Sequence, residues 1–188
     1  LSSFQRIDDL IERMGAITRQ LKSYARKGGE AFEPVDLRQA LSSALSMMEP
    51  QLKARVVKIT RTLPRKPVMV MADRIRLEQV IINLLRNALD ATKDRQGPQI
   101  DLILSQGDTA MLMVRDNGHG IAELDNLFEP FYTTKKPGEG VGLGLAISSG
   151  IVGDLGGRLT ARNAEGGGAV FEMQLPLMRP INEQEAAE

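Results

Sequence analysis

The chain has 188 residues, which exceeds a usual domain of about 100–150 residues and leaves room for one sizeable core plus an appendage. Its 24 basic and 24 acidic residues balance, so no overall field favours an anionic membrane or nucleic acid, and we expect no nucleic-acid partner. The absence of cysteine excludes disulfides and thiolate chemistry. No apolar run approaches the ~20 residues needed to cross a bilayer, so the sequence predicts a cytoplasmic protein.

The first segment, residues 3 to 27, is predicted to form one amphipathic helix. Apolar side chains recur three and four residues apart along it. The glycine pair at positions 28 and 29 ends the helix, and Pro34 marks a linker, which places a domain boundary between residues 28 and 35. The apolar stripe of this helix requires a partner.

Beyond the linker, periodicity predicts alternating helices and strands. Turn residues predict hairpins around Gly107 and around residues 165–168. The glycine-rich segment 117–140 is predicted to be a mobile loop, and the polar tail 179–188 is predicted to be disordered. The predicted elements are helix 36–53, strands 56–60 and 68–71, helix 73–93, strands 100–104 and 110–115, helix 142–155, and strands 157–163 and 169–175.

Two asparagines interrupt the apolar pattern of the second of these helices. Asn83 and Asn87 are four residues apart and therefore share one helix face, where carboxamides are costly to bury without partners. In the functional interpretation, Asn87 offers its oxygen to Mg²⁺ while Asn83 contacts phosphate or the metal's water, because Mg²⁺ binds few protein oxygens alongside phosphate oxygens. In the structural alternative, both amides bond to neighbouring backbone.

An acidic residue follows a predicted strand at Asp116. The next residues, Asn117 and Gly118, are a strong turn signal and by themselves indicate only a turn. Gly120 favours a binding role, because a carboxylate can accept from the adenine amino group only where the surrounding backbone comes close. His119, the only histidine, is interpreted as a lid residue and not as a general base, a metal ligand or a phosphoacceptor.

Glycines recur at every second position from residue 138 to residue 144 and then lead into an apolar helix. This arrangement opens a helix with free amides that suit an anion. The chain has neither a P-loop pattern nor a G-x-G-x-x-G pattern, so neither of those nucleotide folds is supported. Before the glycines, Phe128, Phe131 and Tyr132 suggest a lid that docks. Lys135 or Lys136 could reach the phosphates, and the structural alternative is a solvated lysine pair.

Together these segments resemble, in order and spacing, the motifs of sensor histidine kinases. The motifs are Asn83-x-x-x-Asn87-Ala, Asp116-x-Gly118-x-Gly120, Phe128-x-Pro-Phe131 and Gly140-x-Gly142-x-Gly144-Leu. The chain looks most like the C4-dicarboxylate transport sensors of two-component systems. The resemblance implies three segments: the second helix of a dimerisation hairpin with its linker at 1–34, an ATP-binding catalytic domain at 35–178, and the tail at 179–188.

The resemblance implies an α/β fold, the Bergerat-type ATP-binding sandwich, in which a mixed sheet packs on three helices, preceded here by the N-terminal amphipathic helix. It implies ATP and Mg²⁺ as cofactors. The γ-phosphoryl group would pass to a histidine on a dimerisation-hairpin helix and then to the receiver domain of a response regulator. The full-length protein would be a homodimer and an inner-membrane sensor.

Carried over residue by residue, the resemblance implies that Asn87 holds Mg²⁺, that Asn83 contacts phosphate or metal, and that Asp116 binds the adenine amino group. Asn83, Asn87 and Lys135 would be the catalytic residues. The implied cofactor-binding residues are Asn83, Asn87, Asp116, Gly118, Gly120, Phe128, Thr134, Lys135, Gly140, Gly142, Leu143 and Gly144.

Two features depart from the family pattern. The acceptor histidine belongs on the first hairpin helix, which would precede residue 1, so the chain is expected to need a separately supplied acceptor. Many relatives also carry a cation three residues after the metal asparagine, where this chain has Asp90. Lys135, Lys93 and Arg86 are the candidate replacements.

Two other functions remain open. The segment Asn87-Ala-Leu-Asp90-Ala also resembles gyrase-like ATP hydrolases, but these place a base glutamate four residues before the metal asparagine. That position is Asn83, which cannot accept a proton at neutral pH, and Glu78 is too far back along the helix to replace it. The third possibility is a non-catalytic dimerisation module whose lid is ordered by nucleotide.

Overall fold

The computed structural model describes residues 32–134 and 141–178. The predicted helix 3–27, the tail 179–188, Lys135 and Gly140 lie outside the described residues. In chain order the elements are β1 (Glu33–Asp36), α2 (Leu37–Ala54), β2 (Lys58–Thr62), β3 (Met69–Ala72), α3 (Arg74–Ala91), β4 (Gln99–Gln106), β5 (Thr109–Asp116), α4 (Gly144–Asp154), β6 (Arg158–Asn163) and β7 (Ala169–Pro176).

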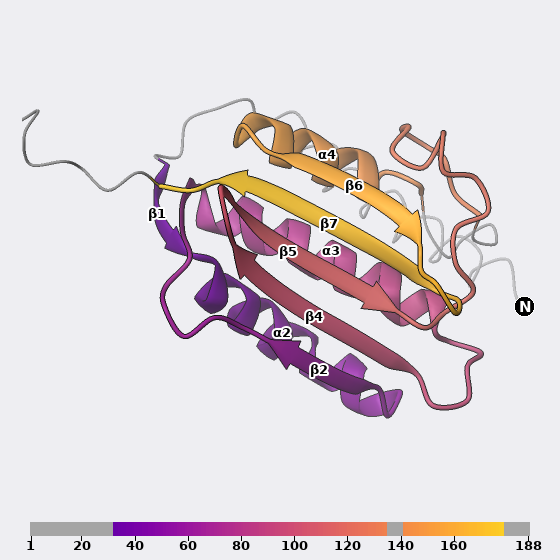
Figure 1. Ribbon diagram of the computed structural model, residues 1–188. Helices are drawn as coiled ribbons and strands as arrows, with labels where there is room; N and C mark the ends of the chain where they lie inside the picture. Colours follow the sequence, from indigo (N-terminus) through magenta and orange to yellow (C-terminus); the bar gives the residue numbers. More distant parts are fainter. Residues whose placement is uncertain (1–31, 135–140, 179–188) are drawn as a thin grey trace, which may run out of the picture.

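The molecule has two layers, a sheet and a row of helices behind it (Figure 1). The sheet has the order β2-β4-β5-β7-β6, in which β2 runs parallel to β4 and the other neighbours are antiparallel. The helices α2, α3 and α4 cover one face of this sheet, with α3 between the other two. The prediction of a mixed sheet on three helices is therefore confirmed.

The core lies between these layers. Along β4 and β5 every second side chain is buried, so Leu102 and Leu112 face the helices while Asp101 and Met113 are only half-buried. The central helix α3 buries seven side chains: Leu77, Val80, Ile81, Leu84, Leu85, Ala88 and Leu89. Such a broad apolar face is what a helix packed against both a sheet and two neighbouring helices requires. Within the described residues, no helix is long and apolar enough to span a membrane.

The structure confirms both predicted hairpins, β4 with β5 and β6 with β7. It differs from the prediction at the start of the domain, where β1 was not predicted. This strand pairs antiparallel with β3 as a separate two-stranded sheet, and β2 pairs with β4 in the larger sheet. Pro34 is tolerated in β1 because this short strand has a partner on one side only.

The end of β1 is also the start of α2, because Asp36 caps the helix. Its carboxylate accepts from the backbone amides of Arg38 and Val68 and from the Arg38 guanidinium. Burial by itself raises the pKa of Asp36, but these hydrogen bonds outweigh it and hold the pKa below its ordinary value. The cap therefore ties β1, α2 and the approach to β3 together.

Candidate nucleotide-binding site

The predicted site residues lie around α3, which connects two groups of them. Asn83 faces the first turn of α4, while Ala91 at the end of α3 lies against the loop that follows β5. Eight residues of helix separate Asn83 from Ala91, about 12 Å at 1.5 Å per residue. We call the part near Ala91 and Asp116 the base end, and the part near Asn83 and Gly144 the phosphate end.

Asp116 is the centre of the base end. It is the last residue of β5 and is only 2% exposed. Its Oδ1 accepts from the amides of Gly118 at 2.8 Å and Ala169 at 3.3 Å, while its buried Oδ2 has no partner among the described residues. Burial raises the pKa of Asp116, and the two amide hydrogen bonds only partly oppose this rise. A buried acceptor without a donor is costly, and a ligand N–H group would satisfy it.

The loop after Asp116 is fixed by backbone contacts. The Asn117 side chain accepts from the Gln99 amide at 2.9 Å and thereby extends the pairing of β4 and β5. Gly118 lies against the end of α3, where an added Cβ would be 2.5 Å from the carbonyl oxygen of Ala91. Arg95 donates to the Gly118 carbonyl at 2.9 Å. The loop thus leaves no space for a side chain at Gly118.

A second set of contacts closes the base end from the other hairpin. Asn163, the last residue of β6, accepts from the Ile121 amide at 2.7 Å and donates to the Ile121 carbonyl at 3.0 Å. Gly120 lies close to the side-chain amide of Asn163, because an added Cβ would be 2.9 Å from Asn163 Oδ1. Gly168, at φ +88°, brings its backbone directly onto that of Asp116. Only glycine combines this dihedral angle with this approach.

The phosphate end joins α3 to α4. Asn83 Nδ2 donates to Ser148 Oγ at 2.9 Å, and a Cβ on Gly144 would be 2.5 Å from Asn83 Oδ1. Asn87 lies one turn further along α3 and is partly exposed. Leu143, buried, precedes the helix as an N-cap residue without a side-chain hydrogen bond. The first amides of α4 therefore have no side-chain cap and can receive an anion.

The residues on either side of the segment 135–140 are joined by a backbone hydrogen bond. The Phe131 amide donates to the Gly142 carbonyl at 3.0 Å. Gly142 has φ +71°, and its added Cβ would be 2.5 Å from the Tyr132 carbonyl oxygen. Phe128 is half-buried against the core, whereas Thr134 is exposed. Phe128 and Gly142 are therefore fixed by packing and hydrogen bonding, and Thr134 lies at the surface.

Asp90, which replaces the expected cation, lies in an ion pair between helices. Its carboxylate is 3.6 Å from Arg55 Nη1, and the same nitrogen donates to the Leu89 carbonyl at 2.9 Å. Asp90 therefore joins the end of α2 to α3. Of the three candidate cations, Arg86 and Lys93 are exposed, and Lys135 lies outside the described residues.

Sequence reasoning did not identify four residues that complete these contacts. They are Ser148 and Asn163, which bond to predicted site residues or to their loop, and Gly168 and Ala169, which contact Asp116. The run of glycines before Ala169 was interpreted as a hairpin turn, which it also is. The signal available for Ser148 in the sequence was a serine within the apolar run that follows Gly144.

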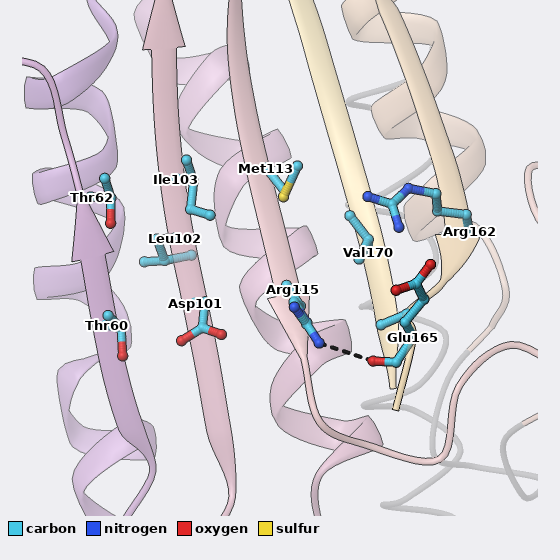
Figure 2. A pocket seen from close by; sticks show the side chains of 11 residues that line it. Thr60, Thr62, Asp101, Leu102, Ile103, Met113, Arg115, Arg162, Glu165 and Val170 are labelled. Carbon is cyan, nitrogen blue, oxygen red and sulfur yellow. Dashed lines mark hydrogen bonds between the residues drawn. The ribbon is translucent and has the colours of Figure 1, made fainter. Parts of the chain in front are cut away.

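A separate hollow lies on the other face of the sheet. Figure 2 shows the side chains that line it, along the outer side of β2, β4, β5, β7 and β6. The hollow has a volume of about 540 Å³. Its lining mixes both charges, including Asp101, Arg115, Arg162 and Glu165, with Ile103 and Met113. It contains none of the predicted site residues, so the site is defined by contacts around α3 and not by this hollow.

These observations define the class of protein. The histidine kinase-, DNA gyrase B- and HSP90-like ATPase family matches residues 72–179, more than half of the chain. The chain therefore belongs to this family of ATPases. The matched range contains every residue of the base end and the phosphate end.

Individual relatives place it among the histidine kinases of that family. It is 41% identical to the C4-dicarboxylate transport sensor protein DctB of Pseudomonas aeruginosa over 92% of this chain and 29% of that protein. The catalytic domain of the histidine kinase ThkA superimposes with a TM-score of 0.70 at 29% identity, covering 78% of this chain and 96% of that one. ThkA in complex with the response regulator TrrA matches with a TM-score of 0.76 at 26% identity, over 92% of this chain and 49% of that one. The chain thus spans less than a third of DctB.

Proposed function

We propose that this chain binds Mg-ATP and transfers its γ-phosphoryl group to a histidine on a dimerisation-hairpin helix, for relay to a response regulator. The observation that carries the proposal is the base end. A buried Asp116 keeps one oxygen without a partner within residues 32–134 and 141–178, and glycine backbone closes around it. This geometry suits the amino group of adenine, which donates and does not accept at that position.

The proposed roles follow from the geometry of the two ends. Asp116 accepts from the adenine amino group, and Gly118 and Gly120 let the backbone approach the base. At the phosphate end, Asn87 holds the metal and Asn83 contacts the phosphates or the metal. The further residues that we propose to line the nucleotide are Phe128, Thr134, Lys135, Gly140, Gly142, Leu143 and Gly144.

The residues present fit Mg²⁺. No cluster of three carboxylate, histidine or cysteine side chains that could hold a metal occurs in residues 32–134 and 141–178. Mg²⁺ does not need such a cluster, because it keeps several waters and binds through one or two protein oxygens together with phosphate oxygens. The carboxamides of Asn83 and Asn87, adjacent on one face of α3, match this requirement. The metal would supply neutralisation of the phosphate charge during transfer.

Phosphoryl transfer requires chiefly positioning and charge neutralisation, which the site residues can provide. Hydrolysis would need a base to activate water. Asn83, at the position of that base in the gyrase-like enzymes, is a carboxamide bonded to Ser148 and cannot take a proton. This observation favours the kinase over the hydrolase.

The remaining parts of the proposal concern the whole protein. We propose that residues 1–34 supply the second hairpin helix and its linker, that residues 35–178 are the catalytic domain, and that the full-length protein is a homodimeric inner-membrane sensor. ThkA, which forms a complex with the response regulator TrrA, supports a receiver domain as partner. The likeness to DctB supports a C4-dicarboxylate as the sensed signal.

The decisive experiment supplies a phosphoacceptor as a separate molecule. The chain is incubated with γ-labelled ATP and Mg²⁺, with and without a separately made dimerisation hairpin that carries a histidine. We expect label on the hairpin, and a hairpin whose histidine is replaced by alanine is the matched control. Label that appears only as free phosphate would instead establish a hydrolase, and would contradict the proposed transfer.

The metal role is tested with Asn87→Ala. We expect loss of Mg²⁺-dependent transfer by at least about 100-fold, the range found when a group that stabilises transition-state charge is removed. Nucleotide binding in EDTA should stay close to that of the wild type, and this measurement serves as the control. Transfer at the wild-type rate would contradict the assignment of Asn87.

A further inference from the structure

Ser148 is a buried polar residue whose role differs from that of the others in the described residues. It lies in the second turn of α4 and is 2% exposed. The other buried polar residues are Asp36 and Asp73, which cap helices, Thr92, which bonds to the end of its own helix, and Asp116 at the base end. The hydrogen bond of Ser148 instead crosses from α4 to Asn83 on α3. Ser148 therefore contacts a residue of the phosphate end and does not cap a helix.

The two ends of the Asn83 carboxamide have different neighbours. The nitrogen Nδ2 donates to Ser148 Oγ at 2.9 Å. The oxygen Oδ1 lies over the first turn of α4, 2.5 Å from where a Cβ of Gly144 would be. The amide nitrogen is thus engaged within the protein, while the oxygen faces the glycine-rich start of α4.

We propose that Ser148 is a positioning residue that orients Asn83 so that its oxygen, and not its nitrogen, is presented to the nucleotide. This inference rests on the proposed function of the site. An amide nitrogen donates and would suit a phosphate oxygen, whereas an amide oxygen accepts and suits Mg²⁺ or a water bound to it. With its nitrogen held by Ser148, Asn83 joins Asn87 on the metal side of the site.

The orientation decides between the two roles that the sequence left open for Asn83. An isolated carboxamide presents nitrogen or oxygen after a half-turn about its terminal bond, so its contact must be selected by a neighbour. In the structure Ser148 is that neighbour, because its hydroxyl accepts from the Asn83 nitrogen, and it acts from the helix whose first turn would receive the phosphates. The hydrogen bond therefore couples the position of α4 to the metal-binding face of α3.

The experiment measures nucleotide affinity by calorimetry in Mg²⁺ and in EDTA, for the full chain and for the variants Ser148→Ala, Ser148→Thr and Ser149→Ala. We expect Ser148→Ala to weaken ATP binding in Mg²⁺ about threefold to tenfold, the usual worth of one hydrogen bond, and to leave binding in EDTA unchanged. Ser148→Thr keeps the hydroxyl and should restore metal-dependent binding. Ser149, the partly exposed neighbour, is the matched control and should have no effect.

A double-mutant cycle with Asn83→Ala distinguishes an effect of Ser148 on the position of Asn83 from an effect on the stability of the fold. If Ser148 acts through Asn83, its substitution should have no further effect on affinity in the Asn83→Ala background. Additive losses, or equal losses in Mg²⁺ and in EDTA, would overturn the role of Ser148. Wild-type protein that fails to bind ATP at all would instead overturn the proposed function on which this role rests.

Discussion

The base end and the phosphate end of the site are constructed differently. At the base end, Asp116 and its loop are held by hydrogen bonds from Gly118, Ala169 and Arg95, and a Cβ added at Gly118 or Gly168 would meet backbone. At the phosphate end, the close contact of Gly144 is with the side chain of Asn83. At Gly118 and Gly168 the base end is therefore bounded by backbone, whereas at Gly144 the phosphate end is bounded by a rotatable side-chain amide.

The two ends are suited to two different tasks of a nucleotide site, recognition of the base and binding of the phosphates. Recognition of a base depends on a fixed donor and acceptor pattern, which rigid backbone provides without cost at the moment of binding. A triphosphate with its metal changes charge and shape during transfer, so residues that can shift are suited to it. We therefore expect a substitution of glycine by alanine to act through folding at the base end, and through ligand affinity at the phosphate end.

The largest effect is expected for Gly118→Ala. The added Cβ would be 2.5 Å from the Ala91 carbonyl oxygen, and helix backbone cannot yield. We expect a loss of about 1–3 kcal/mol in the free energy of unfolding, the usual cost of overpacking, together with loss of measurable ATP binding. Denaturant unfolding and calorimetry measure both quantities.

The matched control is Gly150→Ala, the same substitution in α4. Nothing lies within 4 Å of its added Cβ, so stability should rise by about 0.5–1 kcal/mol through helix propensity. A Gly118→Ala protein as stable as the wild type would contradict the rigidity of the base end.

The next effect is expected for Asp116→Asn. The amide oxygen can still accept from Gly118 and Ala169, but a nitrogen would replace Oδ2 and face the adenine amino group donor to donor. We expect ATP affinity to fall about 10–100-fold, the usual worth of one or two charge-assisted bonds, and preference for adenine over guanine to weaken. Asp101→Asn on the outer face of the sheet is the control. Unchanged selectivity would remove Asp116 from base recognition.

At the phosphate end, Gly144→Ala should leave stability nearly unchanged. The Asn83 amide can rotate away from the new Cβ, but it then leaves its hydrogen bond with Ser148. We expect ATP affinity in Mg²⁺ to fall by up to about tenfold, while adenosine binds as well as before because the base end is intact. A large loss of folding stability in Gly144→Ala would contradict the proposed difference between the base end and the phosphate end.

The sequence predicted part of each end of the site. Asn83 and Asn87 could be proposed as site residues because each is an amide in an apolar helix, and Asp116 could be proposed because Gly120 follows it closely. The strands and helices that deliver them follow from periodicity, and both hairpins follow from their turn residues. The α/β sandwich itself was predicted through the family resemblance.

The rest depends on contacts between segments far apart in the chain. Asn163 bonds to Ile121 and Ala169 bonds to Asp116, across 42 and 53 positions of sequence. Nothing local distinguishes these residues from others in a hairpin. Strand β1 was missed because Glu33-Pro34-Val35-Asp36 is short and contains proline, and only its pairing with β3 makes it a strand.

The smallest effect concerns pH, and it has opposite signs for stability and for binding. Burial raises the pKa of Asp116 in the folded protein above its ordinary value of 3.8. The folded state therefore binds the proton more tightly than the unfolded state, so this residue's contribution to stability is complete below pH 3.8 and is lost as pH rises through the raised pKa. The free energy of unfolding of the wild type, measured relative to Asp116→Asn, should fall across that window. ATP affinity should rise across the same window, because only the ionised carboxylate offers Oδ2 as an acceptor to the amino group. If the difference in ATP affinity between the wild type and Asp116→Asn does not change with pH, adenine is recognised elsewhere.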